Sequence, residues 1–542
     1  MKTIKYIAGV AVALVSMTSC NDFLTTSPKD ALSPSSTWQT QDDASKFLVG
    51  CYDGWESSDL LLYLDAGSDY GFNNFSWEGF TNIGNGTFSA SDPGWTLYGF
   101  GMIRRCNTFL DNVEKCSFSS DAVKNDMIAQ AKAIRAWRYL KMETAYGGVP
   151  IIDNYSSADE AKVPRNTDQE VRDYIMKNLN EALTGIADQP SQRGRIAKGA
   201  VLAMKMRASL YWGEYQQAKD AAQQIIDLGQ YSLDPNYANV FTVAGQSSPE
   251  IILACQNITG TYSLYTIGQL YNNGDGGWSS VVPTQNLIDD YEMSNGLTKE
   301  EAGSGYDPTH PFHNRDPRMA MTVLYPGCEW TTTGGSNEVF NTLDEKNPNG
   351  TNNVNYPTYA DNASKTSLTW AKYLAPASQY ADMWDTQCCP IVFRYAEVLL
   401  TWAEAENELN GPSTAVYDKL DQIRQRVGMP KVDRAKYGTK ETLRELIRRE
   451  RGVEFAGEGI RRFDLVRWKD NNGQMVAMKR LNGELKRVTG TINYSESDPT
   501  KRATITGTAV IENRQFQEYN KLFPIPQSSI DKNTTLTQNP GY

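Results

Sequence analysis

Apolar residues recur at helical spacing in three separate blocks of the chain. The blocks cover residues 40–55 together with 95–146, then 168–228, and then 390–468. Within each block the apolar positions repeat every three or four residues, which is typical of a helix with one buried face. The first block ends at Tyr146-Gly147-Gly148-Val149-Pro150, where glycine favours a chain reversal and proline prevents the helix from restarting. The pattern therefore predicts a mainly α-helical protein.

Two of the blocks contain a pair of apolar stripes separated by a turn. In the second block the stripes are Ala197, Val201, Met204, Ala208 and Tyr211 before Gly213, and Tyr215, Ala218, Ala222 and Ile225 after it. In the third block they are Ala396, Leu400 and Ala403 before Gly411-Pro412, and Val416, Leu420, Ile423 and Val427 after it. A helix pair of about 34 residues with this pattern resembles a tetratricopeptide repeat. Since one such hairpin cannot bury its own apolar face, we expect the copies to stack into a scaffold.

The stretch from residue 235 to 389 lacks this periodicity and is rich in Gly, Asn, Thr, Pro and aromatic residues. An irregular segment of this length is usually functional or disordered, and its aromatic content favours an ordered, functional one. Near the end of the chain, alternation around residues 504–511 predicts a strand, and Phe523-Pro524-Ile525-Pro526 predicts an extended segment. We therefore expect a single domain over residues 37–542. Its helical parts cover about 37–234 and, with the extended tail, about 390–542, and a ligand-binding segment of about 235–389 lies between them.

The first 36 residues have the pattern of a targeting sequence. Lys2 and Lys5 precede a short apolar run over residues 7–15, and small residues follow up to Cys20. This order is typical of a secretory signal peptide, and a cysteine directly after small residues indicates lipid attachment. We therefore expect a signal peptide over residues 1–19, lipid attachment at Cys20 and a polar tether that extends to residue 36. Secretion without lipid attachment is the alternative.

Composition narrows the possible functions. The chain has 542 residues and a formal net charge of −11, and an acidic protein is poorly suited to general binding of nucleic-acid phosphates. The mean hydropathy is −0.52, and the chain has no run of about eighteen apolar residues, which argues against a multi-span membrane protein. The sequence contains 12 Trp and 29 Tyr but only 2 His. This balance favours a binding protein over a catalyst that depends on histidine.

Motifs for common catalytic and metal sites do not occur in the sequence. It lacks a GxSxG elbow, a phosphate-binding glycine loop and an HExxH pair. His310 and His313 have a spacing that can bind zinc on a helix, but the neighbouring prolines prevent a helix, so a loop is favoured. The cysteines beyond Cys20 are odd in number and include no CxxC pair, although a bridge between Cys106 and Cys116 is left open. We therefore expect no metal and no cofactor.

Several passages along the chain together resemble one protein family. They are Cys20-Asn21-Asp22-Phe23-Leu24, Ile134-Arg135-Ala136, Tyr146-Gly147-Gly148-Val149-Pro150, Leu210-Tyr211-Trp212-Gly213-Glu214-Tyr215, Arg394-Tyr395-Ala396-Glu397-Val398-Leu399-Leu400, Arg449-Glu450-Arg451-Gly452-Val453-Glu454-Phe455, Phe523-Pro524-Ile525-Pro526 and Asn539-Pro540-Gly541-Tyr542. In this order they resemble the SusD/RagB family of outer-membrane nutrient-binding lipoproteins nearly from end to end. The most specific passage begins at Arg449 and continues to Trp468.

This resemblance implies a fold, a location and a partner. The fold would be a set of tetratricopeptide-like helical hairpins that support an irregular ligand-binding half. The protein would be lipid-anchored at the surface of the outer membrane of a Gram-negative cell. There it would sit as a lid over a SusC-like TonB-dependent transporter, capture oligosaccharides and release them into the barrel. Relatives of the RagB type handle peptides instead, so a peptide ligand is the alternative.

The charged run from residue 450 to 467 has two interpretations. Glu450 and Glu454 lie one turn apart on the apolar face of a predicted helix, which is an arrangement suited to the acid and base of a secreted glycosidase. That chemistry needs a carboxyl group with a raised pKa, whereas nearby arginines lower the pKa of a carboxyl group. The favoured interpretation is therefore a structural ion-pair network of Glu450, Glu454, Arg461, Asp464 and Arg467.

Aromatic residues in loops are the remaining functional candidates. A sugar ring has an apolar face that a flat Trp or Tyr can cover, and a rim of hydroxyls that Asn and Asp can bond. Residues 69–77 and 272–278 combine these residue types. The candidate ligand-binding residues are Tyr70, Asn73, Asn74, Trp77, Trp278, Trp330 and Tyr356. For each of them the alternative is packing in the core. The sequence thus predicts a binding protein for oligosaccharides that is not an enzyme.

Overall fold

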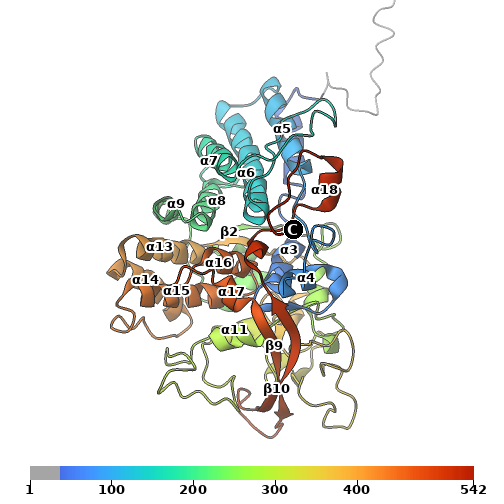
Figure 1. Cartoon of the computed structure of the whole chain (residues 1–542), viewed down its shortest axis with the longest axis vertical. Helices are drawn as coiled ribbons and strands as arrows, with labels where there is room; N and C mark the ends of the chain where they lie inside the picture. The colour runs from blue at the N-terminus through green and yellow to red at the C-terminus, as the bar shows by residue number, and fades with distance from the viewer. Residues whose placement is uncertain (1–36) are drawn as a thin grey trace, which may run out of the picture.

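A computed structural model describes residues 37–542, so the predicted signal peptide, the lipid-attachment cysteine and most of the tether lie outside the described residues. The described part is mainly α-helical, as predicted, and the helices α5 to α7 lie at the opposite end of the molecule from the hairpin β9–β10 (Figure 1). The longer helices are α2 (Gln41–Tyr52), α5 (Gly101–Asn112), α6 (Asp121–Tyr146), α7 (Asp168–Leu183), α8 (Lys198–Tyr211), α9 (Tyr215–Asp227), α13 (Tyr395–Asn410), α14 (Thr414–Arg426) and α15 (Lys440–Glu454). The shorter helices are α3 (Ser58–Tyr63), α4 (Phe80–Asn85), α10 (Thr266–Leu270), α11 (Gln285–Asp290), α12 (Arg318–Thr322), α16 (Arg461–Arg467), α17 (Ala477–Arg480) and α18 (Gln527–Lys532).

The longer helices stack one against the next. Helix α6 contacts α7, α7 contacts α8, and α8 contacts α9. Helix α9 then contacts α13, which contacts both α14 and α15. The two hairpins predicted from the apolar stripes, α8–α9 and α13–α14, are therefore neighbours although residues 228–394 separate them in the chain (Figure 1). This stack forms the scaffold that carries the irregular part of the molecule.

Small side chains allow the scaffold helices to approach closely. The buried alanines are Ala200, Ala203 and Ala208 in α8 and Ala218, Ala221 and Ala222 in α9. Between the two helices, Gly213 has a φ of +76°, a backbone conformation that glycine adopts without the steric cost of a Cβ atom. The predicted stripes are therefore the faces that α8 and α9 bury.

The second part of the first helical block begins later than its sequence pattern predicts. The described helix α5 starts at Gly101, whereas the pattern begins at residue 95. The segment before it is held along α6, because Arg138 donates hydrogen bonds to the carbonyl oxygens of Leu97 at 2.6 Å and Gly99 at 3.2 Å. These contacts use backbone groups that a longer helix would need for itself.

Strands in the described residues form five antiparallel pairs. They are β1 (Gly71–Asn73) with β3 (Val281–Pro283), β2 (Ile251–Ala254) with β8 (Ile391–Arg394), β4 (Val323–Leu324) with β7 (Thr369–Trp370), β5 (Glu329–Thr331) with β6 (Asn337–Val339), and β9 (Asn482–Ile492) with β10 (Ala503–Gln515). The predicted strand around residues 504–511 lies within β10. Four of the pairs use strands from the irregular segment, which is otherwise made of turns and short helices.

One apolar core joins the scaffold, the irregular segment and the C-terminal tail. Its buried members include Trp137 of the scaffold, Tyr271 of the irregular segment and Phe523 of the tail. Trp137 also contacts Phe393, with the ring centroids 5.1 Å apart. This shared core attaches the irregular loops to the scaffold.

Among the helices of residues 37–542, none is long and apolar enough to cross a membrane.

Replacing Ala222 by leucine should overpack the contact between α9 and its neighbours. Ala222 is fully buried, so the added atoms have no free space and must displace side chains. We expect the free energy of unfolding to fall by about 1–3 kcal/mol, measured by urea denaturation with circular dichroism. Ala415→Leu, at an exposed position in the first turn of α14, is the control and should change it by less than about 0.5 kcal/mol. An equal loss in both variants would contradict the close packing of α9.

Candidate functional site

Glu454 lies at the centre of a buried ion-pair network. It contacts Arg318 Nη1 at 3.0 Å and Arg394 Nη1 at 2.7 Å, and it also pairs with Arg426. The side chains of these three arginines are at most 3% exposed, and that of Glu454 is fully buried. Charges removed from water to this extent are tolerated only when each has partners, so this arrangement fixes the relative positions of the segments that supply them.

Glu450, the other half of the supposed acid–base pair, is held in the same way. Its Oε2 lies 3.0 Å from Arg318 Nη2, and its Oε1 pairs with Arg424. Burial by itself would raise the pKa of both glutamates, but the surrounding guanidinium groups outweigh it and hold both pKa values below the ordinary value for glutamate. Neither carboxyl group keeps a proton at neutral pH, so neither can act as a general acid.

Arg461 and Arg467 form neighbouring ion pairs and do not contact the two glutamates. Arg461 Nε lies 2.9 Å from Asp69 Oδ1, and Arg467 Nη2 lies 2.7 Å from Asp464 Oδ1. The chain turns sharply at residues 457–459, where both glycines have positive φ, and this turn directs α16 away from the end of α15. The cations closest to the glutamates therefore come from distant parts of the sequence.

Three of the aromatic and amide candidates are buried, which corrects the expectation that they contact a ligand. Tyr70 is fully buried, and its hydroxyl donates to Asp290 Oδ2 at 2.6 Å. Asn73 donates from its side-chain amide to the backbone carbonyl of Ser280, just before β3, at 2.9 Å. Trp330 donates from Nε1 to Asp275 Oδ2 at 2.6 Å. These side chains anchor the base of the loops because their polar atoms are already bonded within the fold.

The other candidates lie at the surface of the irregular half. Trp77 is 75% exposed and packs one face against Phe75, with ring centroids 4.4 Å apart. Trp278 and Tyr356 are half-buried. Asn74 is also half-buried, but its amide is occupied by backbone groups of residues 363–365, so it holds that loop in place. Trp77, Trp278 and Tyr356 therefore keep ring surface that a ligand can reach.

Trp278 belongs to a group of three rings that sequence reasoning did not bring together. Tyr265 lies 4.7 Å from Trp384 and 6.0 Å from Trp278, and the two tryptophans are 5.2 Å apart, measured between ring centroids. We call Tyr265, Trp278 and Trp384 the aromatic cluster. Tyr265 is 47% exposed. The density of aromatic residues in the irregular segment was the only sequence signal for Tyr265 and Trp384.

Neighbouring loops are tied to the aromatic cluster by backbone hydrogen bonds. The backbone N–H of Asn74 donates to the carbonyl of Ser280 at 2.8 Å, which joins the Trp77 loop to the segment that follows Trp278. The loop that carries Tyr262 is joined to the Trp384 loop, because the N–H of Gly260 donates to Asp385 Oδ1 at 2.8 Å. Tyr262 is 73% exposed, so both of the loops joined in this way carry an exposed ring.

The loops around the aromatic cluster are acidic. Residues 70–79, 257–278, 354–365 and 382–386 contain five carboxylates and one amine, which are Glu78, Asp275, Asp361, Asp382, Asp385 and Lys365. The Lys365 ammonium group donates to two backbone carbonyls at 3.2 Å, and burial lowers its pKa. The surface is therefore better suited to a neutral ligand than to an anionic one.

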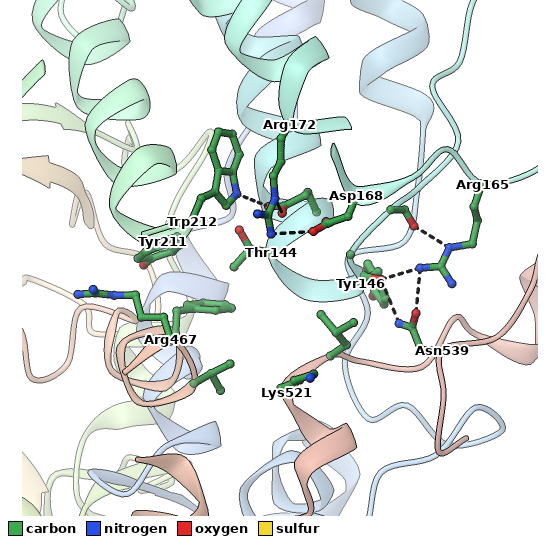
Figure 2. Close-up of a pocket in the computed structure, with 16 residues that line it drawn as sticks. Thr144, Tyr146, Arg165, Asp168, Arg172, Tyr211, Trp212, Arg467, Lys521 and Asn539 are labelled. Atoms are coloured by element: carbon green, nitrogen blue, oxygen red, sulfur yellow. Dashed lines mark hydrogen bonds and ion pairs between the residues drawn. The ribbon is translucent and has the colours of Figure 1, made fainter. Parts of the chain in front are cut away.

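A cleft lies outside these loops, between the scaffold and the C-terminal part of the chain. It has a volume of about 430 Å³ and no lining residue in common with the loops of the aromatic cluster. Figure 2 shows Thr144 of α6 and Tyr211 and Trp212 at the end of α8 around this cleft, with Arg467 beside Tyr211 and Lys521 below them. Sequence reasoning missed this cleft, because its walls come from segments that lie far apart in the chain.

Comparison with known protein families decides the classification. A family model described as the SusD family matches residues 249–542, and a second one, described as starch-binding and associating with the outer membrane, matches residues 22–210. The chain belongs to the SusD family. The resemblance found in the sequence motifs is thereby confirmed, and the mainly α-helical architecture is that of SusD-like proteins.

Individual SusD-like proteins are similar over most of their length. SusD-like protein P25 of Formosa agariphila is 25% identical over 498 residues, which cover 83% of this chain and 87% of that protein. Starch-binding protein SusD of Bacteroides thetaiotaomicron is 26% identical over 491 residues, or 83% of this chain and 78% of that protein. The crystal structure of a SusD-like carbohydrate-binding protein of Bacteroides fragilis matches with a TM-score of 0.79 at 25% identity, covering 92% of this chain and all of the other.

Histidines and cysteines of this SusD-family protein have structural contacts. His310 Nδ1 lies 2.9 Å from the carbonyl of Ala503, and His313 Nδ1 lies 2.8 Å from Thr500 Oγ1, so both rings meet the hairpin β9–β10. Cys106 and Cys116 are not bridged, and all seven cysteines of residues 37–542 are buried free thiols. Within the same residues, no group of His, Cys, Asp and Glu side chains is arranged to hold a metal ion.

The ion pairs predict that this SusD-family protein loses stability in acid. Burial opposes ionisation of Asp69 and Glu404, but the arginines beside them lower the pKa of each to about 2. A carboxyl group whose pKa is lower in the folded state than in the unfolded state stabilises the fold at pH values above its unfolded-state pKa. This stabilisation is lost as the pH falls through the folded-state pKa. We therefore expect the free energy of unfolding to fall between about pH 4.5 and pH 2.

Asp69→Asn tests this expectation, because an amide cannot titrate. The variant should be less stable near neutral pH and should lose less stability in acid than the unsubstituted protein, measured by urea denaturation at a series of pH values. Asp531→Asn, at an exposed position of α18, is the control and should follow the unsubstituted protein. The same acid dependence in all three proteins would rule out Asp69 as a source of the effect.

Proposed function

We propose that this protein binds neutral oligosaccharides at the aromatic cluster, without cleaving them, and delivers them to a SusC-like TonB-dependent transporter of the outer membrane. The observation that carries the proposal is the partly exposed cluster of Tyr265, Trp278 and Trp384, with the exposed Trp77 on an adjoining loop. The names of similar proteins support it, since one is a starch-binding protein and another is a carbohydrate-binding protein.

The geometry of the cluster suits sugar rings. Its three rings are inclined to one another by 40° to 75°, so they present several apolar facets in different directions instead of one flat plate. Each facet can cover the C–H face of one sugar unit, and such contacts cost little conformational entropy because aromatic side chains have few rotatable bonds. An extended glycan can therefore contact more than one ring at the same time.

Binding without cleavage is supported by the state of the carboxyl groups. Glycoside hydrolysis uses one carboxylic acid that keeps its proton and one carboxylate, on opposite sides of the bond. Glu450 and Glu454 are both ionised, buried and bonded to arginines, so they offer neither a proton nor access. The exposed aromatic cluster, by contrast, is reached directly from solvent.

The acidic loops define the glycan class within the proposal. A carboxylated or sulfated glycan would be repelled by Glu78, Asp361, Asp382 and Asp385, and the one lysine of the same loops already bonds to backbone carbonyls. Neutral glycans avoid this cost. Short peptides are the alternative ligand in the family resemblance, and they are included in the test as a separate arm.

Removing a ring of the surface should weaken glycan binding. We expect Trp77→Ala and Trp278→Ala each to raise the dissociation constant for a bound neutral oligosaccharide by about tenfold or more, because each removes a stacking face. Isothermal titration calorimetry against panels of neutral glycans, anionic glycans and peptides measures this. Trp402→Ala, which changes a half-buried tryptophan of the scaffold, is the matched control.

Three results would count against the proposal. Unchanged affinity in both surface variants would exclude this surface, and tight binding of peptides alone would exclude glycans as the ligand. Formation of shorter glycans during incubation with the purified protein would exclude a role in binding alone. Circular dichroism of each variant confirms that a loss of affinity does not come from unfolding.

The proposed location depends on Cys20. We propose that a lipid on this cysteine holds the protein at the membrane, where a transporter partner would lie. Cys20→Ala should therefore move the protein from the membrane pellet to the soluble fraction, measured by fractionation and immunoblotting. Cys389→Ala, which changes a buried cysteine, should leave it in the pellet. Retention of the Cys20→Ala protein in the pellet would contradict lipid anchoring.

A further inference from the structure

We propose that the cleft between the scaffold and the C-terminal part of the chain is a second binding site, which takes one or two units of a neutral saccharide. The inference rests on the cleft alone and does not require the aromatic cluster. The volume of about 430 Å³ is within the range of small-molecule sites. The cleft continues into a second lobe of about 500 Å³, and the two lobes share Tyr211, Trp212, Val466, Arg467 and Lys521.

One wall of the cleft is aromatic and held in place. Trp212, at the end of α8, donates from Nε1 to Glu143 Oε2 at 2.9 Å, and the guanidinium group of Arg172 lies 5.4 Å from the centre of its ring. Tyr211 stacks on Phe463 of α16, with ring centroids 5.9 Å apart. These contacts fix the rings before any ligand arrives, so a sugar ring can stack without the cost of ordering them.

Two polar groups that line the cleft have bonding capacity left. Thr144 Oγ1 makes no hydrogen bond within residues 37–542, although the residue lines the cleft (Figure 2). Lys521 has a single distant partner, Glu518 at 3.8 Å. Together they offer a hydroxyl that can donate or accept and an ammonium donor, and sugar hydroxyls can bond to both.

Most of the charged groups around the cleft are already bonded within the fold, which favours a neutral ligand over an ion. The lining contains four cations, which are Arg165, Arg172, Arg467 and Lys521, and two carboxylates, Glu143 and Asp168. Arg172 is paired with Glu143 and Asp168, and Arg467 is paired with carboxylates behind the wall. Arg165 donates to carbonyls at the end of α6, where the helix dipole is negative. An anion or a cation would have to compete with these existing partners. Either ion would lose its hydration without a matching gain.

A neutral ring with many hydroxyls fits all of these features. Its C–H face matches Tyr211 and Trp212, and its hydroxyls can accept from Lys521 and bond in either direction with Thr144. A purely apolar ligand would cover the Lys521 ammonium group and the Thr144 hydroxyl without bonding to them, which is unfavourable. The ligand can be a free short sugar or the end of a longer glycan, since both present the same chemistry.

The test removes the aromatic cluster first and then changes the cleft. The full chain carrying Trp77→Ala and Trp278→Ala is titrated with maltose, cellobiose and lactose, and with neutral oligosaccharides of the same linkages, using saturation-transfer NMR. Thr144→Val with Lys521→Met is then added, since valine keeps the shape of threonine and methionine keeps the length of lysine. Lys532→Met, on the exposed surface of α18, is the matched control. Thermal melting confirms that each variant folds.

We expect residual binding in the Trp77→Ala, Trp278→Ala protein, and we expect the cleft substitutions to raise its dissociation constant by about tenfold, since two hydrogen-bonding groups are lost. The Lys532→Met control should not change it. If only the longer glycans bind, and the cleft substitutions weaken that binding in the same way, the cleft holds the end of a longer glycan. Complete loss of binding in the tryptophan variants would overturn the second site and leave the proposed function intact. Residual binding with a dissociation constant that the cleft substitutions leave unchanged would also overturn the second site.

Discussion

The buried pairing of arginine with glutamate is the constraint on which the rest of the structure depends. Arg394, at the junction of β8 and α13, contacts Glu250, Glu454 and Glu458, each at 2.7 Å. These carboxylates come from the irregular segment, from α15 and from the turn that follows it. An unpaired buried charge costs several kcal/mol. Displacing any one of these segments would therefore leave buried charges on the other segments without a partner. The network therefore favours one arrangement of scaffold and loops.

This constraint explains how loops with little regular structure can present a defined surface. Lys372 extends the network into the irregular segment, with its ammonium group 2.8 Å from Glu458. The buried rings and amides at the base of the loops, such as Tyr70 and Trp330, add fixed points closer to the surface. A binding site on loops is specific only when its supporting residues are immobilised. The exposed aromatic rings meet that condition because their supports are buried and bonded.

Periodicity made the helical part of this fold predictable, because α8, α9, α13 and α14 show their buried faces directly in the sequence. Composition was a weaker guide to the loops. It could not separate Trp77, which is exposed, from Trp330, which is buried, since both occur among polar residues and burial depends on distant segments. The partners of Glu450 could not be predicted from the sequence pattern either, because Arg318 precedes Glu450 by 132 residues. Sequence pattern reports local structure, whereas these pairings result from the tertiary fold.

The cleft has a consequence for how ligand binding and folding are coupled. Its C-terminal wall is held to the scaffold by the buried Phe523 and by hydrogen bonds, such as that from Phe523 N–H to the Ala145 carbonyl at 2.7 Å and that from the Asn539 side-chain amide to the Tyr146 carbonyl at 3.0 Å. A saccharide between Thr144 and Lys521 would add contacts across the same boundary. Since a ligand that binds only the folded state stabilises it in proportion to the logarithm of its concentration, occupancy of the cleft would strengthen the attachment of the tail. A ligand at the aromatic cluster would instead contact loops of one half of the molecule only. Binding at either proposed site would stabilise the folded state, but only a ligand in the cleft would do so through contacts on both sides of the boundary between scaffold and tail.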